Sequence, residues 1–231
     1  HRINENPLMN TDGINKIVDL SKIYNIKIQS LTGDCFMQEP FWKSSGVKQA
    51  SLINDFIKVC NNSQKIGINI IVIPLVDNGS IRSNLEEKIL IEFLNDISND
   101  LESKGLRICF ESDFPPSKLA SLIDKLKSDI FGINYDTGNS ASFGFKASEE
   151  FKAYGEKIFN VHIKDRLYKG STVPLLSGNV DFNSVMEELS NVKYKENFIL
   201  QTARSSNGLH AEVLIKYKNI IKNYLDMYNI F

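Results

Sequence analysis

Stretches of apolar residues at helical spacing alternate along this chain with short, strand-like apolar runs. From Asp12 to Tyr24 apolar side chains recur every three or four residues, which predicts an amphipathic helix. The run from Ile68 to Leu75 is almost continuously apolar, which is typical of a parallel strand covered on both faces. The same alternation continues toward the C-terminus, so the pattern predicts repeated β-then-α units.

The expected helices share this period and cover residues 12–24, 49–64, 83–103, 117–127, 148–157, 184–190 and 209–228. The expected strands are short and cover residues 26–32, 68–75, 106–112, 131–137, 159–165 and 197–203. Strict alternation implies parallel strands joined by right-handed crossovers, either in an open doubly wound sheet or in a closed barrel. No glycine-rich phosphate fingerprint follows any strand, and polar residues end several strands, so the barrel is favoured. A closed barrel of this type needs eight strands, and six are predicted here.

The strand from Phe159 to Asp165 has the most informative pattern. Its odd-numbered positions from Phe159 to Ile163 are apolar, and the positions between and after them are Asn160, His162 and Lys164. Helices outside and a polar cavity inside would produce this alternation. For this segment alone, a buried histidine bonded to a neighbour explains the pattern equally well.

Three other predicted strands carry a polar residue at the equivalent place, namely Glu111, Asp136 and Gln201. Burying such groups without partners costs several kcal/mol, so they must bond each other or share a cation. Two carboxylates, an imidazole and an amide suit one divalent ion, Mg²⁺, Mn²⁺ or Co²⁺, with Zn²⁺ as a further alternative. The purely structural alternative is a plug of mutually bonded polar side chains.

Length and charge narrow the function further. With 231 residues we expect a single domain covering 1–231, and the 27 basic and 28 acidic residues exclude binding of nucleic acid or a membrane surface by bulk charge. Three cysteines, an odd number without metal-type spacing, predict reduced thiols inside a cell. No apolar run reaches the ~18–20 residues of a membrane span, and His1–Glu5 does not resemble a secretory signal. We therefore expect a cytoplasmic protein.

Short motifs around three of these residues resemble a known family. Glu111 lies in Cys-Phe-Glu-Ser, Asp136 in Asn-Tyr-Asp-Thr-Gly-Asn and His162 in Val-His-Ile-Lys-Asp. In this order they resemble the xylose isomerase-like TIM barrels, particularly the sugar phosphate isomerase/epimerase branch, from about Ile26 onward. The resemblance implies an α/β fold of the TIM (β/α)8 type in which the six strands are strands three to eight and the first two βα units are missing. Dimers are common in the family, so a homodimer is expected.

The resemblance also implies a ligand set and a reaction. Glu111, Asp136, His162 and Gln201 would bind one divalent metal, and the substrate would be a sugar or sugar phosphate. Family members move a proton through a metal-stabilised enediolate, and the last ligand is usually a glutamate. The amide of Gln201 can coordinate a cation but cannot shuttle a proton, which favours an isomerase that works with Glu111 alone over an epimerase with two glutamates.

The remaining predicted site residues lie close in sequence to the four expected metal ligands. Lys164 would be the second catalytic residue, as an electrophile or a substitute acid. Asn139, Asp165, Arg166 and Arg204 would bind substrate, since phosphate sites often follow the last two strands of such barrels and guanidinium forks suit phosphate oxygens.

Two alternatives from other classes remain at this point. A catalytically reduced barrel that only binds metal or sugar is suggested by Gln201 and the missing strands. Related barrels hydrolyse DNA at abasic sites, but those rely on several clustered histidines. This chain has only His1, His162 and His210, and no basic face is evident.

Overall fold

The structure is a computed structural model that describes residues 3–231. The first two residues of the segment 1–5, for which no secretory signal is predicted, lie outside the described part. The chain divides into two compact units. Unit 1 comprises residues 1–112 and 122–132, and unit 2 comprises residues 113–121 and 133–231. Within residues 3–231, no helix combines the length and apolarity that crossing a membrane requires.

The predicted alternation of helices and strands is confirmed. Described helices are α1 (Thr11–Tyr24), α2 (Asp34–Gln38), α3 (Gly46–Lys65), α4 (Asn84–Ser103), α5 (Pro116–Ile123), α6 (Thr137–Phe143), α7 (Ala147–Tyr154), α8 (Phe182–Asn191) and α9 (His210–Met227). Described strands are β1 (Ser30–Thr32), β2 (Ile70–Leu75), β3 (Arg107–Ser112), β4 (Phe131–Asp136), β5 (Ile158–Ile163), β6 (Asp165–Arg166), β7 (Thr172–Val173) and β8 (Asn197–Leu200). Short 3-10 turns lie at Ile3–Glu5, Pro7–Met9, Phe41–Lys43, Asp77–Gly79 and Gly155–Lys157.

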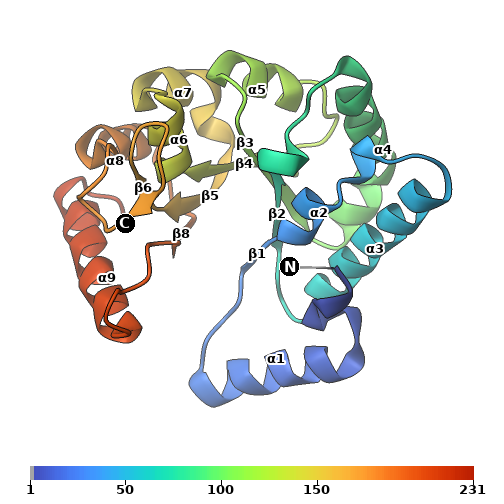
Figure 1. Cartoon of the computed structure of the whole chain (residues 1–231), viewed down its shortest axis with the longest axis horizontal. Helices are drawn as coiled ribbons and strands as arrows, with labels where there is room; N and C mark the ends of the chain where they lie inside the picture. The colour runs from blue at the N-terminus through green and yellow to red at the C-terminus, as the bar shows by residue number, and fades with distance from the viewer. Residues whose placement is uncertain (1–2) are drawn as a thin grey trace. The chain divides into compact units, whose positions relative to one another are not determined.

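Unit 1 is built on three parallel strands in the order β1-β2-β3 (Figure 1). All six residues of β2 are buried, as the continuous apolar run predicts. Helix α3 buries Phe56 and Val59, and the ring of Phe56 packs against Phe41 and Phe93. Trp42 is 1% exposed and donates its indole N–H to the carbonyl of Gly79 at 3.1 Å, so this aromatic side chain is part of the packing of unit 1.

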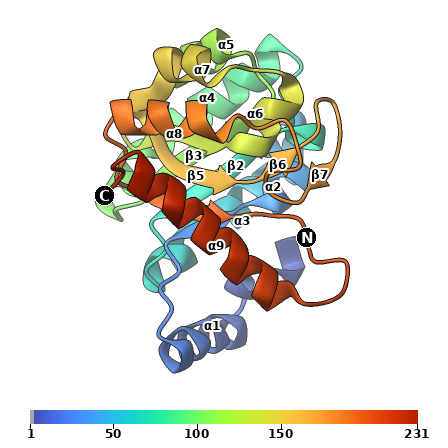
Figure 2. The same ribbon diagram turned by 90° about the vertical axis from the view of Figure 1, so that its left-hand side faces the viewer.

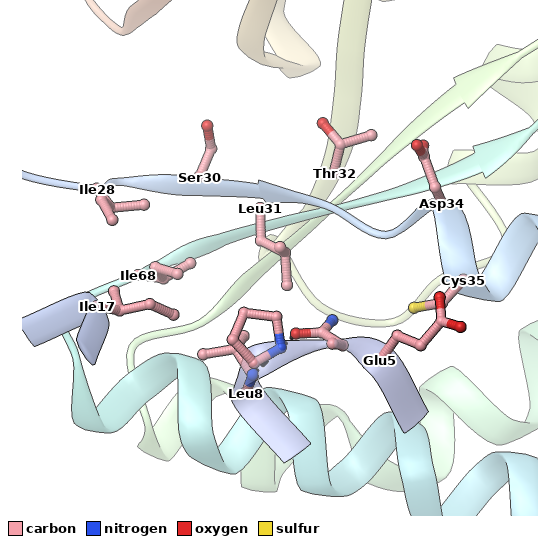
Figure 3. Close-up of a pocket in the computed structure, with 12 residues that line it drawn as sticks. Glu5, Leu8, Ile17, Ile28, Ser30, Leu31, Thr32, Asp34, Cys35 and Ile68 are labelled. Atoms are coloured by element: carbon pink, nitrogen blue, oxygen red, sulfur yellow. Dashed lines mark hydrogen bonds between the residues drawn. The ribbon is translucent and has the colours of Figure 1, made fainter. Parts of the chain in front are cut away.

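Strand β1 is shorter than the sequence pattern suggests. The apolar positions Ile26 and Ile28 lie before the strand and are 59% and 38% exposed. Among the described strands only β2 pairs with β1, so these residues lack the second neighbour that would bury them. In Figure 3, Ser30 and Thr32 point to one side of β1 and Leu31 points to the other, toward Leu8. A cavity of about 410 Å³ lies along this part of unit 1 and is lined mainly by aliphatic side chains.

Unit 2 contains most of β4 and the parallel strands β5 and β8, in the order β4-β5-β8. Asp136 is the register partner of His162, and partners in neighbouring strands point to the same face. Helix α8 contacts both α7 and α9 (Figure 2). The buried face of α8 consists of Phe182, Val185, Met186 and Leu189.

Two local elements of unit 2 were not expected from hydrophobic periodicity. Helix α6 has the sequence Thr-Gly-Asn-Ser-Ala-Ser-Phe, which has no apolar stripe. It forms because the Asp136 side chain caps its first turn and Gly144, with φ of 78°, ends it in the left-handed conformation. The second element is the short antiparallel hairpin of β6 and β7, which packs against α6.

The three cysteines are buried and form no disulfide among the described residues. Burial raises the pKa of the Cys35 thiol to about 11 and that of Cys60 to about 12. Both thiols stay protonated at neutral pH.

Candidate metal centre

Buried polar side chains mark the C-terminal ends of three strands. Glu111 lies in β3 of unit 1 and is 7% exposed. In unit 2, Asp136 ends β4 and His162 lies one residue before the end of β5, and they are 4% and 2% exposed. Carboxylate and imidazole groups are buried this deeply only with partners or a cation, so each side chain requires an explanation.

The two carboxylate oxygens of Asp136 have different environments. Oδ1 accepts a hydrogen bond from the backbone N–H of Asn139 at 2.8 Å, which caps α6. Oδ2 lies 2.7 Å from the ammonium nitrogen of Lys164 and 3.8 Å from Nδ1 of His162. The capping bond fixes the carboxylate, and its second oxygen is directed at the lysine and the histidine.

His162 is held by two asparagines from the same strand pair. The side-chain nitrogen of Asn134 lies 3.0 Å from Nδ1 of His162, and Asn160 donates to Oδ1 of Asn134 at 2.6 Å. With Asn134 as donor, Nδ1 of His162 uses its lone pair to accept this hydrogen bond, so a metal ion at Nδ1 would take the place of the Asn134 amide hydrogen. The two asparagines fix the orientation of the imidazole beside Asp136.

The start of α6 holds the backbone of Lys164 and leaves space for its side chain. The hydroxyl of Thr137 donates to the carbonyl of Lys164 at 2.6 Å and accepts from its N–H at 3.0 Å. A Cβ added at Gly138 would lie 2.8 Å from Cγ of Lys164, so only glycine leaves room for this side chain. Sequence reasoning assigned no role to Thr137 or Gly138, although their position directly after a strand-end carboxylate was a usable signal.

Gln201 follows β8 and donates its backbone N–H to the carbonyl of Ile163 at 3.0 Å. Its side-chain oxygen is buried and accepts no hydrogen bond within the described part of the chain. A buried oxygen without a donor fits a cation ligand, and the place of Gln201 in a metal site stays a prediction.

Of the other predicted site residues, three hold loops of unit 2. Arg166 donates to Oδ1 of Asn139 at 2.6 Å and, through two nitrogens, to the carbonyl of Gly170. Asp165 is 1% exposed, and its carboxylate accepts the backbone N–H groups of Gly178 at 2.8 Å and Val180 at 3.2 Å. The side chains of Arg166 and Asp165 therefore form hydrogen bonds with neighbouring loops of the protein. A role for them in substrate binding stays a prediction.

Arg204 has a different setting from those three. It is exposed in the segment after β8 and lines a cavity of about 480 Å³ together with Gln201 and His210. His210 begins α9, is exposed, and accepts a hydrogen bond from the backbone N–H of Ser205 at 3.2 Å.

A second buried acid of unit 2, Glu150, was missed by sequence reasoning. It is 3% exposed and accepts hydrogen bonds from the hydroxyls of Tyr135 at 3.1 Å, Tyr154 at 2.8 Å and Ser140. Burial raises the pKa of its carboxyl, and burial together with the Glu150 charge raises the pKa of Tyr154. The sequence around Glu150 contains no motif that predicts this hydrogen-bond network.

The fold class is α/β of the TIM-barrel type, and its strand ends carry buried Glu, Asp and His residues, types that can hold a metal ion. The sequence profile of the xylose isomerase-like TIM barrels matches residues 4–219. The chain therefore belongs to this family, as its motifs indicated. No curated protein sequence matches it.

Solved structures with the same fold share little sequence with this chain. A xylose isomerase domain protein from Planctomyces limnophilus is 13% identical, with a TM-score of 0.76 over 94% of this chain and 84% of that chain. A D-tagatose 3-epimerase-like protein is 18% identical, with a TM-score of 0.74 over 95% and 85%. An IolI protein with a bound zinc atom is 18% identical, with a TM-score of 0.74 over 92% and 82%.

Proposed function

We propose that this chain is a divalent-metal-dependent isomerase or epimerase of a sugar or sugar phosphate that acts by proton transfer. The observation that carries the proposal is the buried pair of Asp136 and His162, whose Oδ2 and Nδ1 are 3.8 Å apart and point to one face. Family membership and similarity to sugar epimerases support the same reading.

The proposed ligands are Glu111, Asp136, His162 and Gln201. A bound divalent ion would hold two neighbouring substrate oxygens and stabilise the negative charge that develops when a proton leaves carbon. Glu111 and the orphaned oxygen of Gln201 would complete the set begun by Asp136 and His162. Mg²⁺, Mn²⁺, Co²⁺ and Zn²⁺ all suit these donors, and the zinc of the IolI protein keeps Zn²⁺ among the candidates.

Glu111 is the proposed base. Its carboxylate takes the proton from the carbon next to the carbonyl, the C–H electron pair becomes a carbon–carbon double bond, and the carbonyl oxygen takes the charge. Lys164 donates a hydrogen bond or a proton to that oxygen, since its ammonium lies next to Asp136, one of the proposed metal ligands. The carboxylate then returns the proton to the former carbonyl carbon, and the neighbouring hydroxyl gives its proton to Lys164 as its oxygen becomes the new carbonyl. This completes an aldose–ketose isomerisation with one carbon base, which is why Gln201 favours isomerase over epimerase.

Deuterium incorporation tests this function. The metal-free protein is loaded with Mn²⁺ and incubated in deuterated water with a panel of ketoses and ketose phosphates, and the products are followed by NMR. Deuterium is expected at the carbon next to the carbonyl. Glu111→Gln should lose this exchange by about 1,000-fold, within the range of general-base effects, while retaining most of its Mn²⁺ affinity. Full exchange in Glu111→Gln would refute the role of Glu111.

The second candidate function is a protein that binds metal or sugar without turnover, favoured by the uncharged Gln201. It predicts a heat of binding for Mn²⁺ or sugar in calorimetry and no deuterium incorporation across the panel. A glutamate introduced by Gln201→Glu would then be the informative variant, because it restores the residue usual in the family.

We further propose a cytoplasmic homodimer with a single domain per chain and with no nucleic acid or membrane partner. Sedimentation velocity tests the oligomeric state, and a monomer at micromolar concentration would exclude the dimer. Arg204, Arg166, Asn139 and Asp165 remain the proposed substrate contacts, with Arg204 assigned to a phosphate group.

A further inference from the structure

The metal-facing oxygen of Asp136 already has a cationic partner inside unit 2. Oδ2 lies 2.7 Å from Nζ of Lys164, and the two side chains are 1% and 13% exposed. A carboxylate this deeply buried needs a compensating positive charge, which Lys164 supplies from the neighbouring strand end. The ammonium thus stands at the oxygen that the proposed function assigns to a metal ion.

Two residues at the start of α6 determine where this ammonium group lies. Thr137 holds the Lys164 backbone through two hydrogen bonds of its hydroxyl, and Gly138 leaves the space in which the aliphatic part of the side chain lies. Both residues belong to the first turn of α6, which the Asp136 side chain itself caps. The carboxylate and its counter-ion are therefore fixed by the same turn.

A divalent ion and an ammonium group cannot both occupy this oxygen at low cost. Like charges a few ångströms apart repel strongly in a buried site, and a divalent ion doubles the repulsion that a single charge would exert. The lysine is the mobile partner, because its four-carbon chain has several rotatable bonds whereas the carboxylate is pinned by the N–H of Asn139.

We propose that Lys164 is a displaceable counter-ion: it neutralises Asp136 in the metal-free protein, and metal uptake releases its ammonium toward the substrate. This inference rests on the proposed function, and it makes metal binding the event that frees the second catalytic group. In a metal-free chain, Asp136 and Lys164 would then be paired with each other, so neither would be available to metal or substrate.

Chemical reactivity of Lys164 in the wild-type chain tests the exchange. Metal-free protein and protein titrated with Mn²⁺ are treated briefly with acetic anhydride, and acetylation of each lysine is measured by mass spectrometry. Lys164 is expected to react at least about fivefold faster in the Mn²⁺-loaded protein. Lys152 is exposed on α7 and serves as the internal control, with an unchanged rate. Equal reactivity of Lys164 in the two states, with Mn²⁺ binding verified by calorimetry, overturns the proposal.

Metal affinity provides a second measurement that needs no substrate. Lys164→Met removes the competing charge and should tighten Mn²⁺ binding about tenfold or more, whereas Lys152→Met, which changes net charge equally, should alter it less than twofold. A Lys164→Met affinity equal to that of Lys152→Met contradicts the exchange. If no divalent ion binds the wild-type chain at all, the proposed function fails together with this inference; if ions bind and Lys164 does not respond, only this inference fails.

Discussion

Strands β2 and β5 are both buried parallel strands, yet they differ in the side chains they bury. Every residue of β2 is apolar and buried, whereas β5 buries Asn160 and His162 between apolar positions. In β2 burial itself stabilises the fold. In β5 the polar groups add stability only through partners from β4, and the cost of desolvating them points to a function. Mutations in the two strands should therefore have separable effects on stability and on ligand binding.

The largest effect is expected at the imidazole of β5. His162→Ala removes a proposed metal ligand and should weaken Mn²⁺ binding about 1,000-fold, more than the 10- to 100-fold typical of residues that only support a ligand. Isothermal titration calorimetry on the metal-free protein measures the change. His210→Ala is the matched control, because His210 is exposed on α9 and should leave the affinity unchanged. A wild-type affinity in His162→Ala would remove β5 from the metal site.

The reverse effect is expected in β2. Ile73 is 0% exposed, and Ile73→Ala should lower the free energy of unfolding by about 3 kcal/mol through lost burial and a residual cavity. Urea unfolding measures this cost, and Mn²⁺ affinity of the folded protein should stay within about twofold. Ile215→Ala, at a position that is 60% exposed, should change stability by less than about 0.5 kcal/mol. A large loss of metal affinity in Ile73→Ala would break the distinction between the two strands.

A smaller effect is expected beyond the edge strand β8. Arg204 is exposed, so Arg204→Ala should leave stability unchanged and weaken binding of a sugar phosphate about tenfold, the loss of one charge-assisted hydrogen-bonding group. The corresponding unphosphorylated sugar should bind Arg204→Ala and wild type equally. Equal loss for both sugars, or no loss for either, would exclude Arg204 as a phosphate contact.

The smallest effect concerns Glu150, the buried acid that serves no proposed chemistry. Because its folded-state pKa is raised by burial, its stabilising contribution is present below the unfolded pKa of about 4.5 and is lost as pH rises through the folded value. Glu150→Gln cannot ionise, so the wild-type stability should decline more than that of the variant between pH 4.5 and 8. Urea midpoints at several pH values measure this difference, and parallel pH profiles would show that the carboxyl does not ionise on unfolding.

Sequence reasoning succeeded where one physical signal dominated. The continuous run in β2 and the alternation in β5 predicted two buried strands, and the ordered motifs predicted the family. It also named His162 and Asp136 as neighbours, which the register of β4 and β5 confirms. These correct predictions depend on the periodicity of each strand and on the order of the strands along the chain, and both can be read directly from the sequence.

It failed where structure depends on tertiary partners or on capping. Strand β8 ends at Leu200 rather than Ala203, because only β5 pairs with it among the described strands. Helix α6 has no apolar period and depends on the Asp136 cap, and the Lys164 ion pair requires a glycine whose role is visible only in three dimensions. Hydrophobic periodicity, on which the secondary-structure predictions depend, contains no information about such contacts.

The buried thiols give this chain an internal reporter of opening. Cys60 and Cys109 are 2% and 0% exposed, and the raised pKa of Cys60 leaves almost none of its reactive thiolate at neutral pH. An alkylating reagent should therefore modify these side chains only when unit 1 transiently unfolds around them. The alkylation rate would measure how often that happens in the native protein, without denaturant or an added probe.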